Sequence, residues 1–115
     1  MDRTSEIVTI ASATPRRFID TNILLRFITD DNSVQSPLAA DLFDQIAAGE
    51  IEALLSMTAL FETVFTLQGL YRLEREVISV AIRAIIDAPG LYLIDASAEH
   101  VLRSLELYTS IRQLS

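Results

Sequence analysis

Hydrophobic residues recur along this chain with two spacings. Short apolar runs bounded by polar or turn-forming residues predict strands at residues 17–20, 51–55 and 91–94. Longer segments with apolar residues every three to four positions predict helices at 23–28, 36–49, 58–70, 74–87 and 98–109. Because strands alternate with helices, the order predicts a three-layer α/β fold in which a central parallel sheet is flanked by helices.

Several residues mark where these helices begin and end. Ser36 followed by Pro37 predicts a serine cap with proline in the first helical position, and Gly49 ends that helix. Thr21 or Asn22 is expected to cap the helix at 23–28, and Ser97 the last helix.

The same spacing predicts which helical residues face the core. The residues expected to face inward are Leu38, Leu42, Phe43, Ile46, Val77, Ile78, Ala81, Ile82, Ile85, Val101, Leu102, Leu105 and Tyr108. In the helix at 74–87, Arg75, Ser79 and Arg83 are expected to face water.

The helix at 58–70 is apolar on most of its surface and is expected to be largely buried. Its apolar residues are Leu60, Phe61, Val64, Phe65 and Leu67. Thr58, Glu62 and Thr66 lie four apart and form one polar stripe. A carboxylate in such a helix is costly unless it is paired or binds a metal ion.

Composition narrows the class of protein. The chain has 115 residues, half of them hydrophobic and none of them cysteine, so neither a disulfide framework nor a thiolate metal site is expected. We expect a polar, flexible tail at residues 1–16, in which Ile7–Ile10 is an alternative edge strand, and one domain at 17–115. No apolar run is long enough to span a bilayer, and no signal peptide is evident, so a cytoplasmic protein is expected.

The net charge of −7 has two interpretations. It describes either a solvated acidic surface or a cluster of acids that a cation neutralises. All nine basic residues are arginine, whose planar guanidinium group suits phosphates and carboxylates.

Asp20 is the leading candidate member of such a cluster of acids. It ends a predicted strand, at the sheet edge where ligands bind in parallel α/β folds. Glu62 lies in the helix after the second strand and can approach the same edge. Two carboxylates with retained water suit Mg²⁺ or Mn²⁺, and Thr21 and Asn22 can support them. The pattern predicts metal-assisted hydrolysis of a phosphodiester. A helix cap for Asp20 and a satisfied carboxylate for Glu62 are the simpler alternatives.

Other polar residues are weaker candidates. Asp95 ends the third strand and is expected to serve as a turn or cap residue, although it could reach the site. His100 is expected at the surface, and Asp30 and Asp31 are expected to be solvated loop charges. A glycine-rich phosphate loop is absent from the sequence. A haloacid-dehalogenase-like enzyme would need an aspartate where Asn22 stands.

The segment Phe18-Ile19-Asp20-Thr21-Asn22-Ile23-Leu24-Leu25-Arg26 resembles the opening of PIN-domain proteins, especially VapC-type toxins of toxin–antitoxin pairs. Phe61–Leu67, with Glu62, is similar to the second motif of that family, and the elements up to Asp95 agree with it in order and spacing.

This resemblance implies a PIN-like fold with a Mg²⁺ or Mn²⁺ site and endoribonuclease activity on RNA. Asp20 and Glu62 would be the metal-binding and catalytic acids, with Thr21 and Asn22 in support. An antitoxin that blocks the site is the implied partner, and homodimers are usual in the family.

One departure from the family concerns its third acid. That acid follows a segment like Ile111–Ser115, where this sequence stops, so the closing helix and strand are expected to be missing. The alternative to an active nuclease is therefore a truncated, catalytically impaired PIN-like module that binds a partner or antitoxin.

Overall fold

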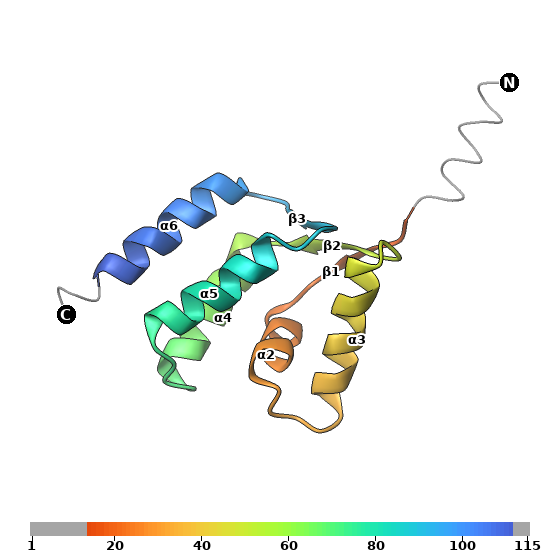
Figure 1. Cartoon of the computed structure of the whole chain (residues 1–115), viewed down its shortest axis with the longest axis horizontal. Coiled ribbons are helices and arrows are strands. Elements are labelled where there is room, and N and C mark those ends of the chain that lie inside the picture. The colour runs from red at the N-terminus through yellow and green to blue at the C-terminus, as the bar shows by residue number, and fades with distance from the viewer. Residues whose placement is uncertain (1–13, 112–115) are drawn as a thin grey trace, which may run out of the picture.

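The computed structural model describes residues 14–111 and has an α/β fold (Figure 1). Within those residues the elements are β1 (Arg16–Phe18), α2 (Thr21–Thr29), α3 (Gln35–Ala47), β2 (Glu52–Leu55), α4 (Met57–Gly69), α5 (Arg75–Ile86), β3 (Leu91–Leu93) and α6 (Ala98–Ile111). The predicted class, a parallel sheet flanked by helices, is confirmed.

The sheet has the order β1-β2-β3, and both strand pairs are parallel. Each crossover between neighbouring strands contains two helices, which are α2 and α3 in the first and α4 and α5 in the second (Figure 1). Because the strands are parallel, their carboxyl ends meet at one edge of the sheet. That edge is where β1 leads into α2 and β2 leads into α4, so it positions both candidate acids.

The first strand begins one residue earlier than expected and ends at Phe18 rather than at Asp20. Arg16, assigned to the tail by sequence, belongs to β1, and its Nε lies 3.0 Å from Oε1 of Glu52 on the neighbouring strand. The rest of the expected tail up to residue 13, including the alternative strand at Ile7–Ile10, lies outside the described residues.

The core lies between the sheet and the helices. Leu24 of α2, Leu55 of β2, Leu67 of α4, and Ile78 and Ile82 of α5 are completely buried. Five separate apolar side chains from four elements thus exclude water from one centre, which is the main source of stability in a domain of this size.

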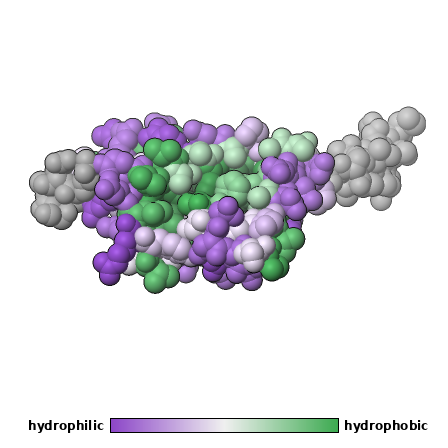
Figure 2. All heavy atoms as spheres, turned by 60° about the horizontal axis from the view of Figure 1, so that its bottom comes forward, coloured by the Kyte–Doolittle hydropathy of each residue, from purple (hydrophilic) through white to green (hydrophobic). Residues whose placement is uncertain are grey.

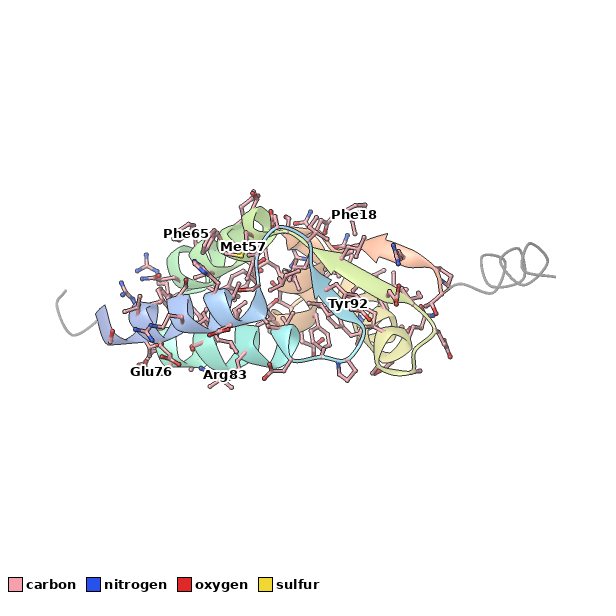
Figure 3. The ribbon with its side chains drawn as sticks, turned by 90° about the horizontal axis from the view of Figure 1, so that it is seen from above. Phe18, Met57, Phe65, Glu76, Arg83 and Tyr92 are labelled. Carbon is pink, nitrogen blue, oxygen red and sulfur yellow. The ribbon has the colours of Figure 1, made fainter. Side chains whose placement is uncertain are left out.

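The other face of the sheet is more accessible to water. Phe18, Leu54 and Tyr92 are aligned by the strand register, so they project from the same face. The side chains of Phe18 and Tyr92 remain 70% and 51% exposed (Figure 3). This face therefore presents aromatic surface to solvent.

The start of α3 differs from the prediction. The residue before the helix is Val34, and Ser36 lies buried inside the first turn. Oδ1 of Asn32 accepts hydrogen bonds from the amides of Val34 (3.0 Å) and Gln35 (2.7 Å). Ser36 is not the cap because Asn32 already satisfies the amides at this end of the helix.

The expected burial of α4 is wrong in part. Leu60, Val64 and Leu67 pack in the core, whereas Phe61 and Phe65 are 44% and 67% exposed. Their rings stack on one another with centroids 6.4 Å apart. Both side chains line a hollow between α4 and α6, which leaves this apolar part of α4 accessible to water. Figure 2 shows hydrophobic residues gathered on one face of the molecule among hydrophilic ones.

The buried stripe of α5 is rotated from the predicted one. Val77 is exposed and Ser79 is buried, the reverse of the expectation, while Ile78, Ile82 and Ile85 face the core as predicted. Arg75 does not face open water, because its Nη1 donates to the carbonyl of Tyr108 at 3.2 Å. Packing of α4 and α6 on α5 sets this orientation.

The last helix agrees with the prediction. Oγ of Ser97 accepts a hydrogen bond from the amide of His100 at 3.1 Å, and Val101 and Leu105 are buried. Among the helices of the described chain, none combines the length and apolarity needed to cross a membrane.

Leu38 and Leu42 provide a matched test of this packing. Both were expected to face inward, yet Leu38 is 63% exposed and Leu42 is 6% exposed on the same helix. We predict that Leu42→Ala lowers the free energy of unfolding by about 2–5 kcal/mol. Leu38→Ala should change it by less than about 0.5 kcal/mol. Urea unfolding of both variants checks this, and equal losses would contradict the packing of α3.

Candidate active site

Asp20 and Glu62 line the same cavity, although they are far apart in the sequence. The cavity has a volume of about 470 Å³ and lies between the start of α2 and the middle of α4. Thr21, Asn22 and Thr66 also line it. The structure thus brings together the four residues that the sequence analysis selected for the site.

Asp20 is held by the helix that it begins. Its Oδ1 accepts a hydrogen bond from the amide of Ile23 at 2.9 Å, which makes Asp20 the N-cap of α2. The expected caps, Thr21 and Asn22, are the first two helical residues instead. The carboxylate remains exposed to solvent while the cap bond fixes its orientation.

Thr21 connects the two helices that carry the acids. Its Oγ1 donates a hydrogen bond of 3.4 Å to the carbonyl of Ala59, which lies one turn before Glu62 on α4. The beginning of α2 is therefore held beside the turn of α4 that presents the second acid. Asn22 is exposed at the cavity wall.

Glu62 lies on the accessible side of α4. Its side chain is exposed, so the sequence-based expectation of a costly buried carboxylate is wrong. Thr66, one turn further along the same stripe, is partly buried and lines the cavity with it, whereas Thr58 does not line it. Glu62 is consequently accessible to an ion or a substrate and does not carry the cost of a buried unpaired charge.

Asp95 does not line this cavity. Its Oδ1 accepts a hydrogen bond from the amide of Met57 at 2.9 Å, next to the cap bond from Ala59 N to Ser56 Oγ. Asp95 thus stabilises the N-terminus of α4, which confirms the cap role expected for it. Between residues 14 and 111, no group of three or more Asp, Glu, His or Cys side chains is arranged to hold a metal ion.

A second hollow adjoins the first. It has a volume of about 570 Å³ and lies between α2 and α3. Asp20, Asn22 and Arg26 line both hollows, so the two are neighbours on α2. We call this second hollow the α2–α3 groove.

A polar network at the wall of the cavity was not predicted from the sequence. Arg26 Nη1 donates to Oδ1 of Asp31 at 2.6 Å, and the hydroxyl of Tyr71 donates to Oδ2 of Asp31, also at 2.6 Å. Asp31 is exposed in the loop after α2, as expected, but its pairing with Arg26 and Tyr71 was not predicted. The spacing of Asn22 and Arg26, four apart on a helix, indicated their common face, but no local pattern indicated Tyr71.

This network changes the acidity of its members. The hydrogen bond from Tyr71, followed by that from Arg26, lowers the pKa of Asp31 from 3.8 to about 2. The same interaction with Asp31 raises the pKa of Arg26. The carboxylate and the guanidinium group thus remain an ion pair throughout the neutral range.

Comparisons with protein-family models, with curated proteins and with solved structures give no match to this chain.

The lowered pKa of Asp31 predicts a specific acid dependence. A carboxyl group with a depressed pKa in the folded state stabilises the fold above its ordinary value of 3.8. That contribution should fall as the pH drops from 3.8 toward 2. Asp31→Asn should remove this part of the pH dependence, as measured by urea unfolding across that range. Asp41→Asn, on the exposed face of α3, is the control and should retain it.

Substitution can separate the capping role of Asp20 from the negative charge of its carboxylate. Asparagine caps helices about as well as aspartate, so Asp20→Asn should change the free energy of unfolding by less than about 0.5 kcal/mol. Asp20→Ala should lower it by about 1 kcal/mol. Thermal unfolding of both variants provides the measurement. Similar losses for the two would mean that the cap bond does not stabilise α2.

Proposed function

We propose that the chain is a PIN-type, Mg²⁺- or Mn²⁺-dependent endoribonuclease that hydrolyses RNA phosphodiesters as the toxin of a toxin–antitoxin pair. The observation that carries the proposal is the shared cavity of Asp20 and Glu62, with Thr21 and Asn22 beside them. This set lies where β1 and β2 lead into their helices, the edge at which parallel α/β folds bind ligands.

The residues present suit a hard divalent cation. Mg²⁺ is commonly held by one or two carboxylates and keeps several water molecules, and both candidate carboxylates are exposed at the cavity. Asp20 and Glu62 would hold the ion. When bound, it would supply a lowered pKa for a coordinated water and stabilise charge on the phosphate.

The chain's own residues would orient the substrate and transfer protons. The cap bond from Ile23 and the Thr21–Ala59 bond hold the Asp20 carboxylate toward the cavity. Glu62, which is exposed, can accept a proton from the attacking water. The Asn22 amide can donate a hydrogen bond to a phosphate oxygen.

A protein partner is part of the proposal. The exposed aromatic side chains of Phe61 and Phe65 lie on α4, the helix that also carries Glu62. An antitoxin or a second copy that covers this surface would lie close to the cavity. A cytoplasmic location agrees with such a complex.

A second candidate function is a catalytically impaired module that binds a partner. The specific observation in its favour is that the described residues bring two acids to the cavity rather than three. This candidate predicts a stable complex or dimer and no metal-dependent cleavage.

Cleavage of single-stranded RNA in the presence of Mn²⁺ tests the two candidates. The nuclease proposal predicts cleavage that EDTA abolishes and that Asp20→Asn and Glu62→Gln each reduce by about a hundredfold or more. Glu106→Gln, an exposed acid on α6, is the matched control and should retain activity. Equal cleavage by Asp20→Asn would refute the proposal. Absence of cleavage with a stable partner complex would favour the binding module.

A further inference from the structure

Arg26 occupies the junction of the two hollows. It lines both the cavity of Asp20 and Glu62, which we call the acidic cavity, and the α2–α3 groove, as do Asp20 and Asn22. It is the one cationic side chain among the described residues that line the acidic cavity.

The guanidinium group is held in a fixed position. Asp31 accepts from its Nη1 at 2.6 Å, and Tyr71 holds Asp31 from the other side. The Arg26 side chain is 26% exposed, so the group is anchored yet open to solvent. Its Nε is buried, and no acceptor within the described residues bonds to it. An anchored guanidinium has further donors that can bind an anion with little loss of side-chain entropy.

Because the chain is acidic overall, a fixed guanidinium group would help it to bind a nucleic-acid substrate. With a net charge of −7, most of the surface repels phosphates. Arg17 lines the α2–α3 groove together with Arg26, so two of the nine arginines line the hollow that Asp20 also lines. Asp41 is a further acid in that groove.

The groove also has an apolar wall. Ile23, Leu38 and Leu42 line it, and Leu38 is largely exposed. Apolar walls beside cationic groups suit a single strand, whose bases are free to leave the stack and whose backbone follows the charges. A duplex would keep its bases inside.

We propose that Arg26 binds a phosphate of single-stranded RNA that lies along the α2–α3 groove, and that Arg17 binds a second phosphate further along. This inference rests on the proposed function, because it supplies the substrate path to Asp20 and Glu62. Asp31 and Tyr71 act as positioning residues for the guanidinium group of Arg26.

The test measures RNA affinity at several salt concentrations, with Ca²⁺ in place of Mn²⁺ and a short fluorescent single-stranded RNA as the probe. Each phosphate contact contributes about 0.7 to the slope of log affinity against log salt for single strands. Arg26→Gln should therefore reduce that slope by about 0.7 and weaken binding at low salt. Arg83→Gln is the matched control, because Arg83 is exposed on α5 (Figure 3) and lines neither hollow.

The affinity for Mn²⁺ separates phosphate binding from a structural role. Loss of a positive charge beside two carboxylates should leave Mn²⁺ binding unchanged or make it tighter. If Arg26→Gln weakens Mn²⁺ and RNA binding together, Arg26 acts through the shape of the cavity and the inference is wrong. Arg26→Lys keeps the charge and should keep the salt slope, which provides a second variant if Arg26→Gln folds poorly.

The outcomes also distinguish this inference from the proposed function. If the protein binds RNA without cleaving it, and Arg26→Gln shows the predicted loss of salt slope, the inference holds and the nuclease proposal is wrong. Cleavage that depends on Asp20, with an unchanged slope in Arg26→Gln, would retain the nuclease and reject the inference. If the folded protein does not bind RNA, the inference is wrong as well.

Discussion

The packing of α2 against α4 is the constraint on which the candidate site depends. Each helix follows a strand of the parallel sheet, so both begin at the same edge. Leu24 and Leu67 are completely buried, and the hydrogen bond from Thr21 to Ala59 joins the two helices near the sheet. Asp20 and Glu62 line one cavity because these contacts leave their helices little freedom to separate. The positions of both acids thus depend on apolar packing to which neither acid contributes.

The polar network of Arg26, Asp31 and Tyr71 restrains the far end of the same pair of helices. Arg26 belongs to α2, Asp31 to the loop after it, and Tyr71 to the connection after α4. The helix pair is thus held by a hydroxyl near the sheet and by an ion pair away from it. Since the Asp31 carboxyl has a low pKa, this restraint persists in neutral solution.

Several local features could be predicted from the sequence. The strand before Asp20, the order of elements and the capping of α6 by Ser97 all depend on neighbouring residues, and the structure agrees with them. The caps of α2 and α3 were predicted wrongly, because Asp20 and Asn32, which lie earlier in the chain than the expected caps, accept the amide hydrogen bonds. Other predictions failed where tertiary contacts decide. The apolar pattern of α4 did not reveal that Phe61 and Phe65 face water, and Tyr71 reaches Asp31 across a long interval of sequence. The shared cavity of Asp20 and Glu62 was predictable from topology, but the exposure of Glu62 was not.

The aromatic surface of Phe18 and Tyr92 has a consequence for the life of the protein in a cell. Chaperones and proteases recognise exposed apolar side chains, and a chain that presents them is subject to continuous quality control. A molecule that covered this face of the sheet would shield the protein from turnover. The cellular abundance of the chain would then follow the supply of that covering molecule, rather than the rate of its own synthesis alone.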